Sequence, residues 1–115
     1  MLSNELATEI AKLALEKKAS DIIILKVAPL TSIADYFVIC SGSTNTQVKA
    51  IAEHVVSELK EKRNRPQHIE GLGNQEWVLL DYIDVIAHIF QPHKREFYGL
   101  ERLWGDAEKI EVKDE

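Results

Sequence analysis

Two features of the chain could serve phosphoryl transfer: a small turn after an apolar run, and a pair of acids further along. Gly42-Ser43 lies where a strand is expected to turn into a helix, and helix N-termini bind phosphate. Two-metal transfer also needs carboxylates converging from one strand face, conventionally two residues apart. Asp81 and Asp84 are three apart, across an expected turn. The residues therefore favour no enzyme. The alternative to a protein without catalytic activity is a nucleotide-binding or nucleotidyltransferase-type enzyme that uses Gly42-Ser43.

The other reactive side chains form no recognisable catalytic unit. The 4 histidines are scattered over an expected helix, two strands and a loop, and none stands at metal-ligand spacing from another ligand. Cys40 ends an apolar run with no base beside it, which indicates a packed thiol rather than a nucleophile. Ser41 and Ser43 lack the glycines on both sides that a nucleophile elbow requires. We expect no catalytic residue, no metal and no cofactor.

The first half of the chain alternates between helical and strand patterns. Apolar residues recur at helical spacing over about 4–18, and again from the capping-box sequence Thr44-Asn45-Thr46-Gln47 to about residue 63. Between these segments, β-branched runs at 22–27 and 36–40 predict two strands.

The second half is expected to complete a single α/β domain. Strands at about 67–70, 77–81 and 83–90 are predicted to form an antiparallel meander, followed after Pro92 by a short helix that contains Phe97, Leu100, Leu103 and Trp104. Gly99 inside that helix should cost about 1 kcal/mol relative to Ala. These elements predict a mixed five-stranded sheet with helices packed on it, over residues 1–105. Residues 106–115 hold five acidic residues and two lysines, and we expect them to be disordered.

The expected sheet has more apolar surface than two helices can cover. Several strands are apolar at consecutive positions, a pattern typical of sheets covered on both faces. Two helices can cover one face, so part of the other should be buried by the third helix, by a second copy or by a different protein. We therefore expect the sheet to carry an interaction surface.

Composition narrows the class of partner and the compartment. At 115 residues and 45% hydrophobic, the chain fits one core. A net charge of −5 disfavours direct nucleic-acid binding and favours basic protein partners. The single cysteine forms no internal disulfide, which suits a reducing compartment such as the cytosol. We find no signal or transit peptide, and no apolar run approaches the roughly 20 residues needed to cross a bilayer.

Five segments of the sequence resemble the Iojap family, whose bacterial members are called ribosomal silencing factors. The segments are DYFVICSGS (35–43), EG (70–71), WVLLDY (77–82), DVIAHIF (84–90) and YGLERLW (98–104). They occur in the family's order, without large gaps, over roughly residues 4 to 105. The resemblance is therefore far more specific than any one of the short motifs.

The resemblance implies a binding protein rather than an enzyme. It implies a fold related to nucleotidyltransferases without their activity, and often a homodimer when free. The implied partner is the large ribosomal subunit, through ribosomal protein L-fourteen, where the chain would sterically block subunit association and so repress translation. A dimeric adaptor with no ribosomal role is a third possibility.

One turn departs from the family pattern. The family usually has Gly between the two aspartates, whereas here the chain reads Asp81-Tyr82-Ile83-Asp84. A β-branched residue resists positive φ, so we expect this turn to differ in shape.

Trp77 is expected to be the centre of the partner-binding region. Large aromatic side chains dominate interface hot spots, although from the residues alone a core tryptophan is an equally good interpretation. The resemblance places this strand, with the neighbouring Glu70 and Gly71, in the region that binds the partner. Alternation puts Trp77, Leu79 and Asp81 on one strand face, where Asp81 could meet a basic side chain. The alternative for Asp81 is a turn residue that bonds its own backbone.

The segment after Pro92 is expected to supply the rim of the interface. Spacings of three and four place Tyr98 beside Glu101 and Arg102 on the expected helix, although solvated charges on an amphipathic helix are the alternative. Arg95, with Lys94, follows Pro92 in an expected loop. This basic pair could bind an acidic group or contact rRNA at the periphery, but solvated charge is the commoner outcome.

Overall fold

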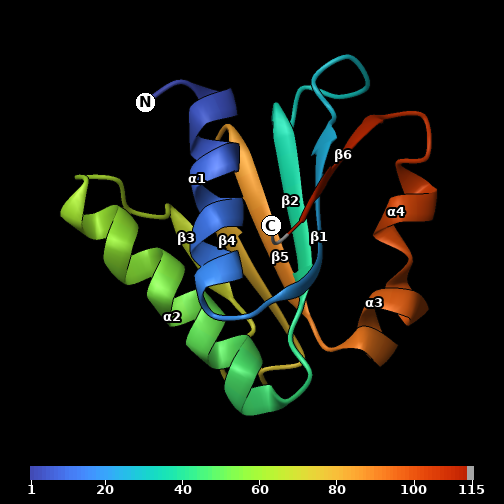
Figure 1. The fold of residues 1–115 in the computed structure, drawn as a ribbon. Helices are drawn as coiled ribbons and strands as arrows, with labels where there is room; N and C mark the ends of the chain where they lie inside the picture. The colour runs from blue at the N-terminus through green and yellow to red at the C-terminus, as the bar shows by residue number, and fades with distance from the viewer. Residues whose placement is uncertain (114–115) are drawn as a thin grey trace.

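The computed structural model describes residues 1–113, with helices on both sides of one sheet (Figure 1). The helices are α1 (Ser3–Glu16), α2 (Asn45–Glu61), α3 (Pro92–Tyr98) and α4 (Leu100–Leu103), and the strands are β1 (Ser20–Lys26), β2 (Tyr36–Ser41), β3 (His68–Glu70), β4 (Trp77–Asp81), β5 (Val85–Phe90) and β6 (Glu108–Val112). Among residues 1–113, no helix combines the length and the apolarity needed to span a membrane.

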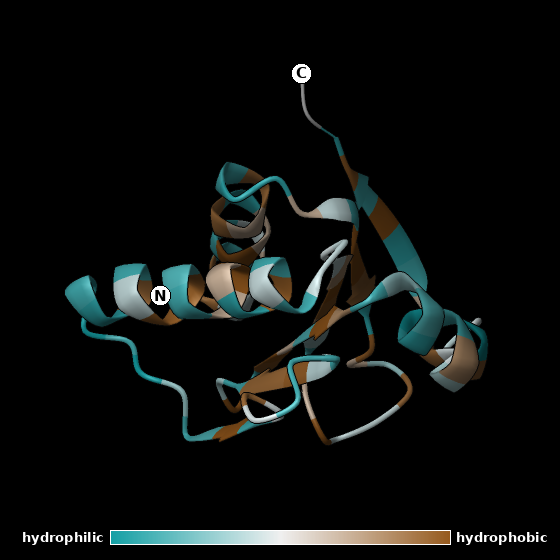
Figure 2. Ribbon diagram, turned by 90° about the horizontal axis from the view of Figure 1, so that it is seen from below, coloured by the Kyte–Doolittle hydropathy of each residue, from teal (hydrophilic) through white to brown (hydrophobic). Residues whose placement is uncertain are grey.

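The sheet is mixed, as predicted, but it has six strands. Its order is β3-β4-β5-β2-β1-β6; β2 and β5 run parallel, and the other neighbours are antiparallel. The prediction of five strands is wrong because Glu108–Val112 pairs with β1 along the edge. Figure 2 shows this last strand alternating between hydrophilic and hydrophobic residues. The nucleotidyltransferase-like topology stays a prediction.

The sixth strand was missed because few of its side chains are buried. Ile110 and Val112 lie opposite Ile24 and Ile22 of β1, but Ile110 is itself exposed, and the other three residues of the strand are charged and exposed. An edge strand needs a partner only on one side, and charged residues there oppose pairing with other chains. The acidic composition therefore gives no sign of this strand, which is held in place by its backbone hydrogen bonds to β1.

The larger core lies between the sheet and the pair α1 and α2. Leu6, Ile10, Ile51, Val55 and Leu59 are buried on the two helices, at the helical spacing that the sequence predicted. Burying each such side chain contributes on the order of 2 kcal/mol. At the surface, Lys62 of α2 pairs with Glu9 of α1 at 2.9 Å, and His54 bonds Glu16 at 2.7 Å.

A second, smaller core occupies the opposite face of the sheet. Its buried members are Ile23, Leu25, Val27, Ala34, Phe37, Ile39 and Phe90, with Trp77, Ile86, Leu100, Trp104 and Ala107 packed against them. The expectation that both faces carry apolar side chains is confirmed. Among the helices of residues 1–113, only the short α3 and α4 lie on this face, and neither has a fully buried residue (Figure 1).

The prediction of one helix that runs through Phe97, Leu100 and Trp104 is wrong. The segment is divided at Gly99, which has φ +58° and ends α3 in the left-handed conformation. Gly adopts this conformation without the steric penalty that a Cβ imposes, so it ends a helix more readily than it continues one. The chain then re-enters α4, directed so that Leu100 and Trp104 pack on the second core.

The β4–β5 turn also differs from expectation. Ile83 has φ +74°, although its branched side chain disfavours that region. The turn is closed around Ile83 because the Asp84 amide donates to the Tyr82 carbonyl at 2.9 Å, and the Ile83 amide donates to Asp81 Oδ1 at 2.8 Å. This hydrogen bonding holds Ile83 at positive φ, so the turn keeps a conformation that suits glycine.

Candidate functional site

Trp77 is held half-buried at the edge of the second core. Its Nε1 donates a hydrogen bond to His88 Nδ1 at 3.2 Å, and its ring stacks on Phe90 with centroids 4.9 Å apart. On its other side lies Tyr98 of α3, at 4.6 Å. The indole is therefore neither sealed in the interior nor free to move, which is the state expected of a rigid anchor.

Beside Trp77, the β4 end of the sheet face is left partly open. Leu79 and Asp81 share the face of Trp77, as the predicted alternation requires, and all three are partly exposed. Phe97 packs edge-on against Tyr98 at 5.1 Å and leaves 75% of its surface exposed. We call Trp77, Leu79, Ile86, Phe97 and Tyr98 the aromatic surface.

An exposed phenylalanine next to two aromatic rings calls for an explanation. Tyr98 is 43% exposed, and α3 buries no residue fully, so this helix gains little from packing on its own domain. Contiguous exposed apolar groups on a small protein mark sites where another molecule docks. The aromatic surface therefore has the features of a protein-binding site.

His88 fixes the hydrogen-bonding direction of Trp77. It is 5% exposed on β5, and burial lowers the pKa of its imidazole to about 4. Nδ1 accepts from the indole, so the ring is neutral with its proton on Nε2, which has no partner within residues 1–113. The sequence alone predicts only a structural role for His88. Its period-two spacing from Phe90 was the available sign that it shares the face of Trp77.

Gly71 controls how β3 approaches β4. It has φ +91°, and a Cβ at this position would lie 1.9 Å from the Trp77 carbonyl oxygen. No side chain fits there, so Gly71 supports the strand that carries the anchor. The preceding Glu70 lies at the exposed edge of the sheet and pairs with His68 at 3.1 Å.

Asp81 takes part in the turn, as its alternative interpretation anticipated. One carboxylate oxygen accepts from the Ile83 amide at 2.8 Å. The residue is partly exposed, so the other oxygen can still receive a donor from a partner.

Arg95 is not in a loop, contrary to expectation, but in α3. Its side chain is only 12% exposed; Nε donates to Glu101 at 2.6 Å, and Nη1 donates to Ser41 Oγ at 2.9 Å. Arg95 thus ties α3 to α4 and to the end of β2. The neighbouring Lys94 pairs with Glu76 at 3.3 Å.

The helical neighbourhood predicted for Tyr98, Glu101 and Arg102 is also wrong. Gly99 separates them into two helices, so the spacings of three and four do not apply. Glu101 turns toward Arg95, and Arg102 donates weakly to the Glu96 carbonyl at 3.4 Å. Tyr98 alone of the three joins the aromatic surface.

Comparison with known proteins decides the family. The model of the family described as "Ribosomal silencing factor during starvation" matches residues 2–115. The chain belongs to this family. It is 40% identical to the ribosomal silencing factor of Bacillus subtilis over 92 residues, covering 80% of this chain and 78% of that one. The resemblance drawn from the five segments is confirmed.

A solved structure and a further relative also resemble this chain. A crystal structure of a Chromobacterium violaceum protein superimposes with a TM-score of 0.89 at 36% identity, covering 91% of this chain and 88% of that one. The mouse protein named "Mitochondrial assembly of ribosomal large subunit protein 1" is 33% identical over 92 residues, covering 77% of this chain and 40% of that one.

The groups that suggested an enzyme are engaged within the silencing factor. Ser43 donates from both its amide and its hydroxyl to Gln47 Oε1, at 2.7 and 2.8 Å, so the donors of the small turn serve the cap of α2. Burial raises the pKa of the Cys40 thiol to about 12. Over the described part of the chain, no group of three or more His, Cys, Asp or Glu could hold a metal ion.

Proposed function

We propose that this silencing factor binds the large ribosomal subunit through a basic ribosomal protein, L-fourteen, and sterically blocks the small subunit from joining. Family membership supports the ribosomal role. The observation that carries the mode of binding is the aromatic surface, with Phe97 75% exposed beside Trp77 and Tyr98. Binding alone would repress translation in this way, so the proposal needs no cofactor or chemical step.

The aromatic surface suits a central anchor. Trp77 and Tyr98 are already ordered by their ring contacts, so their docking requires little further loss of side-chain entropy. Rigid aromatic groups surrounded by polar residues are the usual arrangement of interface hot spots. We propose Trp77, Leu79 and Tyr98 as the centre of the interface.

Three of the four charged residues proposed around this centre are acidic, which suits a basic partner. Glu70, Asp81, Glu101 and Arg102 are proposed as rim contacts, with Gly71 and Arg95 positioning the elements that carry them. The net charge of −5 should speed the encounter with a basic protein and make the association rate fall as salt rises. Peripheral contact with rRNA, through Lys94, is a secondary part of the proposal.

The direct test is cosedimentation with purified ribosomal subunits, together with a subunit-joining assay. We expect the protein to sediment with large subunits and not with small ones, and to reduce the yield of joined ribosomes when added first. Equal sedimentation with both subunits, or binding that leaves joining unchanged, would contradict the proposal.

We also propose that the free protein is a cytoplasmic homodimer. An exposed aromatic surface on a chain of this size would be covered by a second copy when no ribosome is present. Analytical ultracentrifugation of the free protein tests this part separately, and a monomer at micromolar concentration would remove it.

A further inference from the structure

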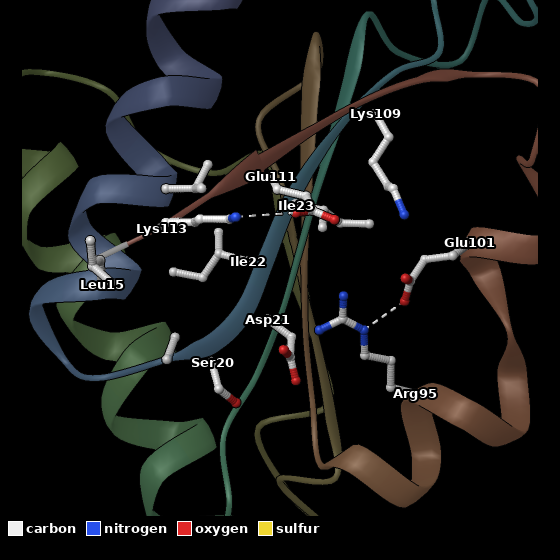
Figure 3. Close-up of a pocket in the computed structure, with 12 residues that line it drawn as sticks. Leu15, Ser20, Asp21, Ile22, Ile23, Arg95, Glu101, Lys109, Glu111 and Lys113 are labelled. Atoms are coloured by element: carbon white, nitrogen blue, oxygen red, sulfur yellow. Dashed lines mark hydrogen bonds and ion pairs between the residues drawn. The ribbon is translucent and has the colours of Figure 1, made fainter. Parts of the chain in front are cut away.

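A cavity lined by both charged and apolar residues lies between β1, β6 and the α3–α4 segment, apart from the aromatic surface. It has a volume of about 570 Å³, and its charged lining residues are Asp21, Arg95, Glu101, Lys109, Glu111 and Lys113 (Figure 3). A second cavity of about 290 Å³ shares Asp21, Arg95 and Glu101 with the first. Cavities of roughly 300–1,000 Å³ are the size that holds small molecules.

The backbone is distorted where Asp21 enters this cavity. The pairing of β1 with β2 slips between Ser20 and Ile23, and Asp21 has φ +49°. Such bulges re-aim a side chain, and residues in the left-handed region are found preferentially at functional sites. Asp21 makes no ion pair with any residue in 1–113, so its carboxylate is available to a ligand.

Arg95 supplies a partly used donor to the same cavity. Its Nε and Nη1 are bonded to Glu101 and Ser41, whereas Nη2 has no hydrogen bond to residues 1–113. Lys109, on β6, also has no ion pair in this part of the chain. Figure 3 shows the Arg95 guanidinium with Asp21 on one side and Glu101 and Lys109 on the other.

The charges of the larger cavity cancel. Asp21, Glu101 and Glu111 oppose Arg95, Lys109 and Lys113. Glu101 is already paired with Arg95, and Glu111 lies 4.0 Å from Lys113. The free groups are therefore a carboxylate on β1 and an ammonium on β6, with a guanidinium donor between them. A ligand with one charge would satisfy one of these and repel the other.

We propose that this cavity binds a small zwitterion, a free α-amino acid. Its ammonium group lies at Asp21, and its carboxylate lies at Arg95 Nη2 and Lys109. Because Asp21 belongs to β1 and Arg95 to α3, the ligand joins the sheet to the segment that carries Phe97 and Tyr98. The proposal does not use Trp77, Leu79 or Tyr98, the proposed centre of the ribosomal interface, and it is tested without ribosomes, although Arg95 and Glu101 belong to both sites.

The test is a titration of the uniformly ¹⁵N-labelled protein with each proteinogenic amino acid, followed by amide chemical shifts and thermal unfolding. At about 10 mM, at least one amino acid should raise the unfolding midpoint by roughly 2–4 °C. It should also shift the amide resonances of Asp21, Arg95 and Lys109. Sodium acetate and methylammonium chloride, each carrying one charge, should produce neither effect.

Two variants test the assigned contacts. Asp21→Asn removes the charge and keeps a side chain that tolerates positive φ, so the fold is preserved. Asp21→Asn and Lys109→Gln should each weaken the binding of the selected amino acid at least about tenfold. This is the effect expected from loss of a charged hydrogen bond. Glu58→Gln removes a carboxylate from α2, on the other face, and should bind like the parent protein.

Three results would overturn the proposal. They are the absence of any amino acid that shifts these resonances, equal effects of acetate or methylammonium, and undiminished binding by Asp21→Asn.

Discussion

At the residue scale, the contact between His88 and Trp77 determines how the anchor responds to pH. Burial holds the pKa of His88 near 4, below its ordinary value of 6.5. The folded state therefore binds fewer protons than the unfolded state between these values, and the free energy of unfolding falls as pH decreases. Protonation would also remove the acceptor that holds the indole.

We predict that the free energy of unfolding decreases by about 3 kcal/mol between pH 6.5 and 4 because of His88, and that this contribution is constant above and below that window. Chemical denaturation across this pH range, compared with His88→Phe, measures the effect. The variant should have a shallower dependence on pH. Parallel curves for the two proteins would show that His88 does not titrate in this way.

Ile83 is a residue whose type conflicts with its backbone. At φ +74° its branched side chain is strained, while its exposed surface gains nothing from burial. Ile83→Gly should raise the free energy of unfolding by about 1 kcal/mol, because relief of strain exceeds the added flexibility of the unfolded chain. Ile83→Ala keeps the positive-φ penalty and should gain much less in the same denaturation experiment. A loss of stability in Ile83→Gly would contradict this account.

Gly71 is the opposite case, because its backbone conformation and its surroundings require glycine. Gly71→Ala should lower the free energy of unfolding by about 3 kcal/mol or more, since its Cβ would meet the Trp77 carbonyl at 1.9 Å and φ is +91°. Gly73→Ala is the matched control, because nothing lies within 4 Å of its Cβ position. Thermal unfolding of both variants should separate them clearly. Similar midpoints would mean that the turn can relax.

At the element scale, Arg95 determines where α3 and α4 lie. Its bonds to Glu101 and Ser41 connect two short helices to β2, and a lysine cannot make both bonds with the same planar geometry. Arg95→Lys should increase hydrogen exchange of α3 and α4 amides at least about tenfold, while α1 and α2 amides change little. Lys94→Arg, at a partly exposed neighbour that pairs with Glu76, should leave these rates unchanged. Uniformly faster exchange across all helices would instead indicate global destabilisation.

The helices and strands show which parts of the fold can be predicted from local sequence patterns. Both long helices and five of the strands could be predicted because burial imposes a period on their side chains. The cap of α2 was also visible, since the Gln47 amide donates to Thr44 Oγ1 as predicted. β6 and the division at Gly99 could not be found in this way, because one depends on backbone pairing with a distant strand and the other on packing against the second core.

The candidate site was only partly visible for the same reason. Trp77, Leu79 and Asp81 could be placed on one face from alternation alone. The burial of Arg95, its bond to Ser41, and the bond from Trp77 to His88 join elements distant in the sequence, so no local pattern reports them.

At the scale of the whole molecule, the two faces of the sheet have different roles. α1 and α2 cover one face with a large core and give the domain most of its stability. The other face has a smaller core, short helices and exposed aromatic rings. This asymmetry explains how a chain of 115 residues can be stable and still leave an apolar surface for a partner.

The central claim is that the aromatic surface binds the large ribosomal subunit. Its most direct test is the dissociation constant for large subunits of Phe97→Ala, a substitution at a side chain that is 75% exposed and contributes little to the fold. We predict a loss of about 2 kcal/mol in binding free energy, roughly thirtyfold in affinity, with thermal stability unchanged. Leu2→Ala, at a 67% exposed residue beside α1, should bind like the parent protein. Equal affinity of Phe97→Ala and the parent protein would contradict the claim.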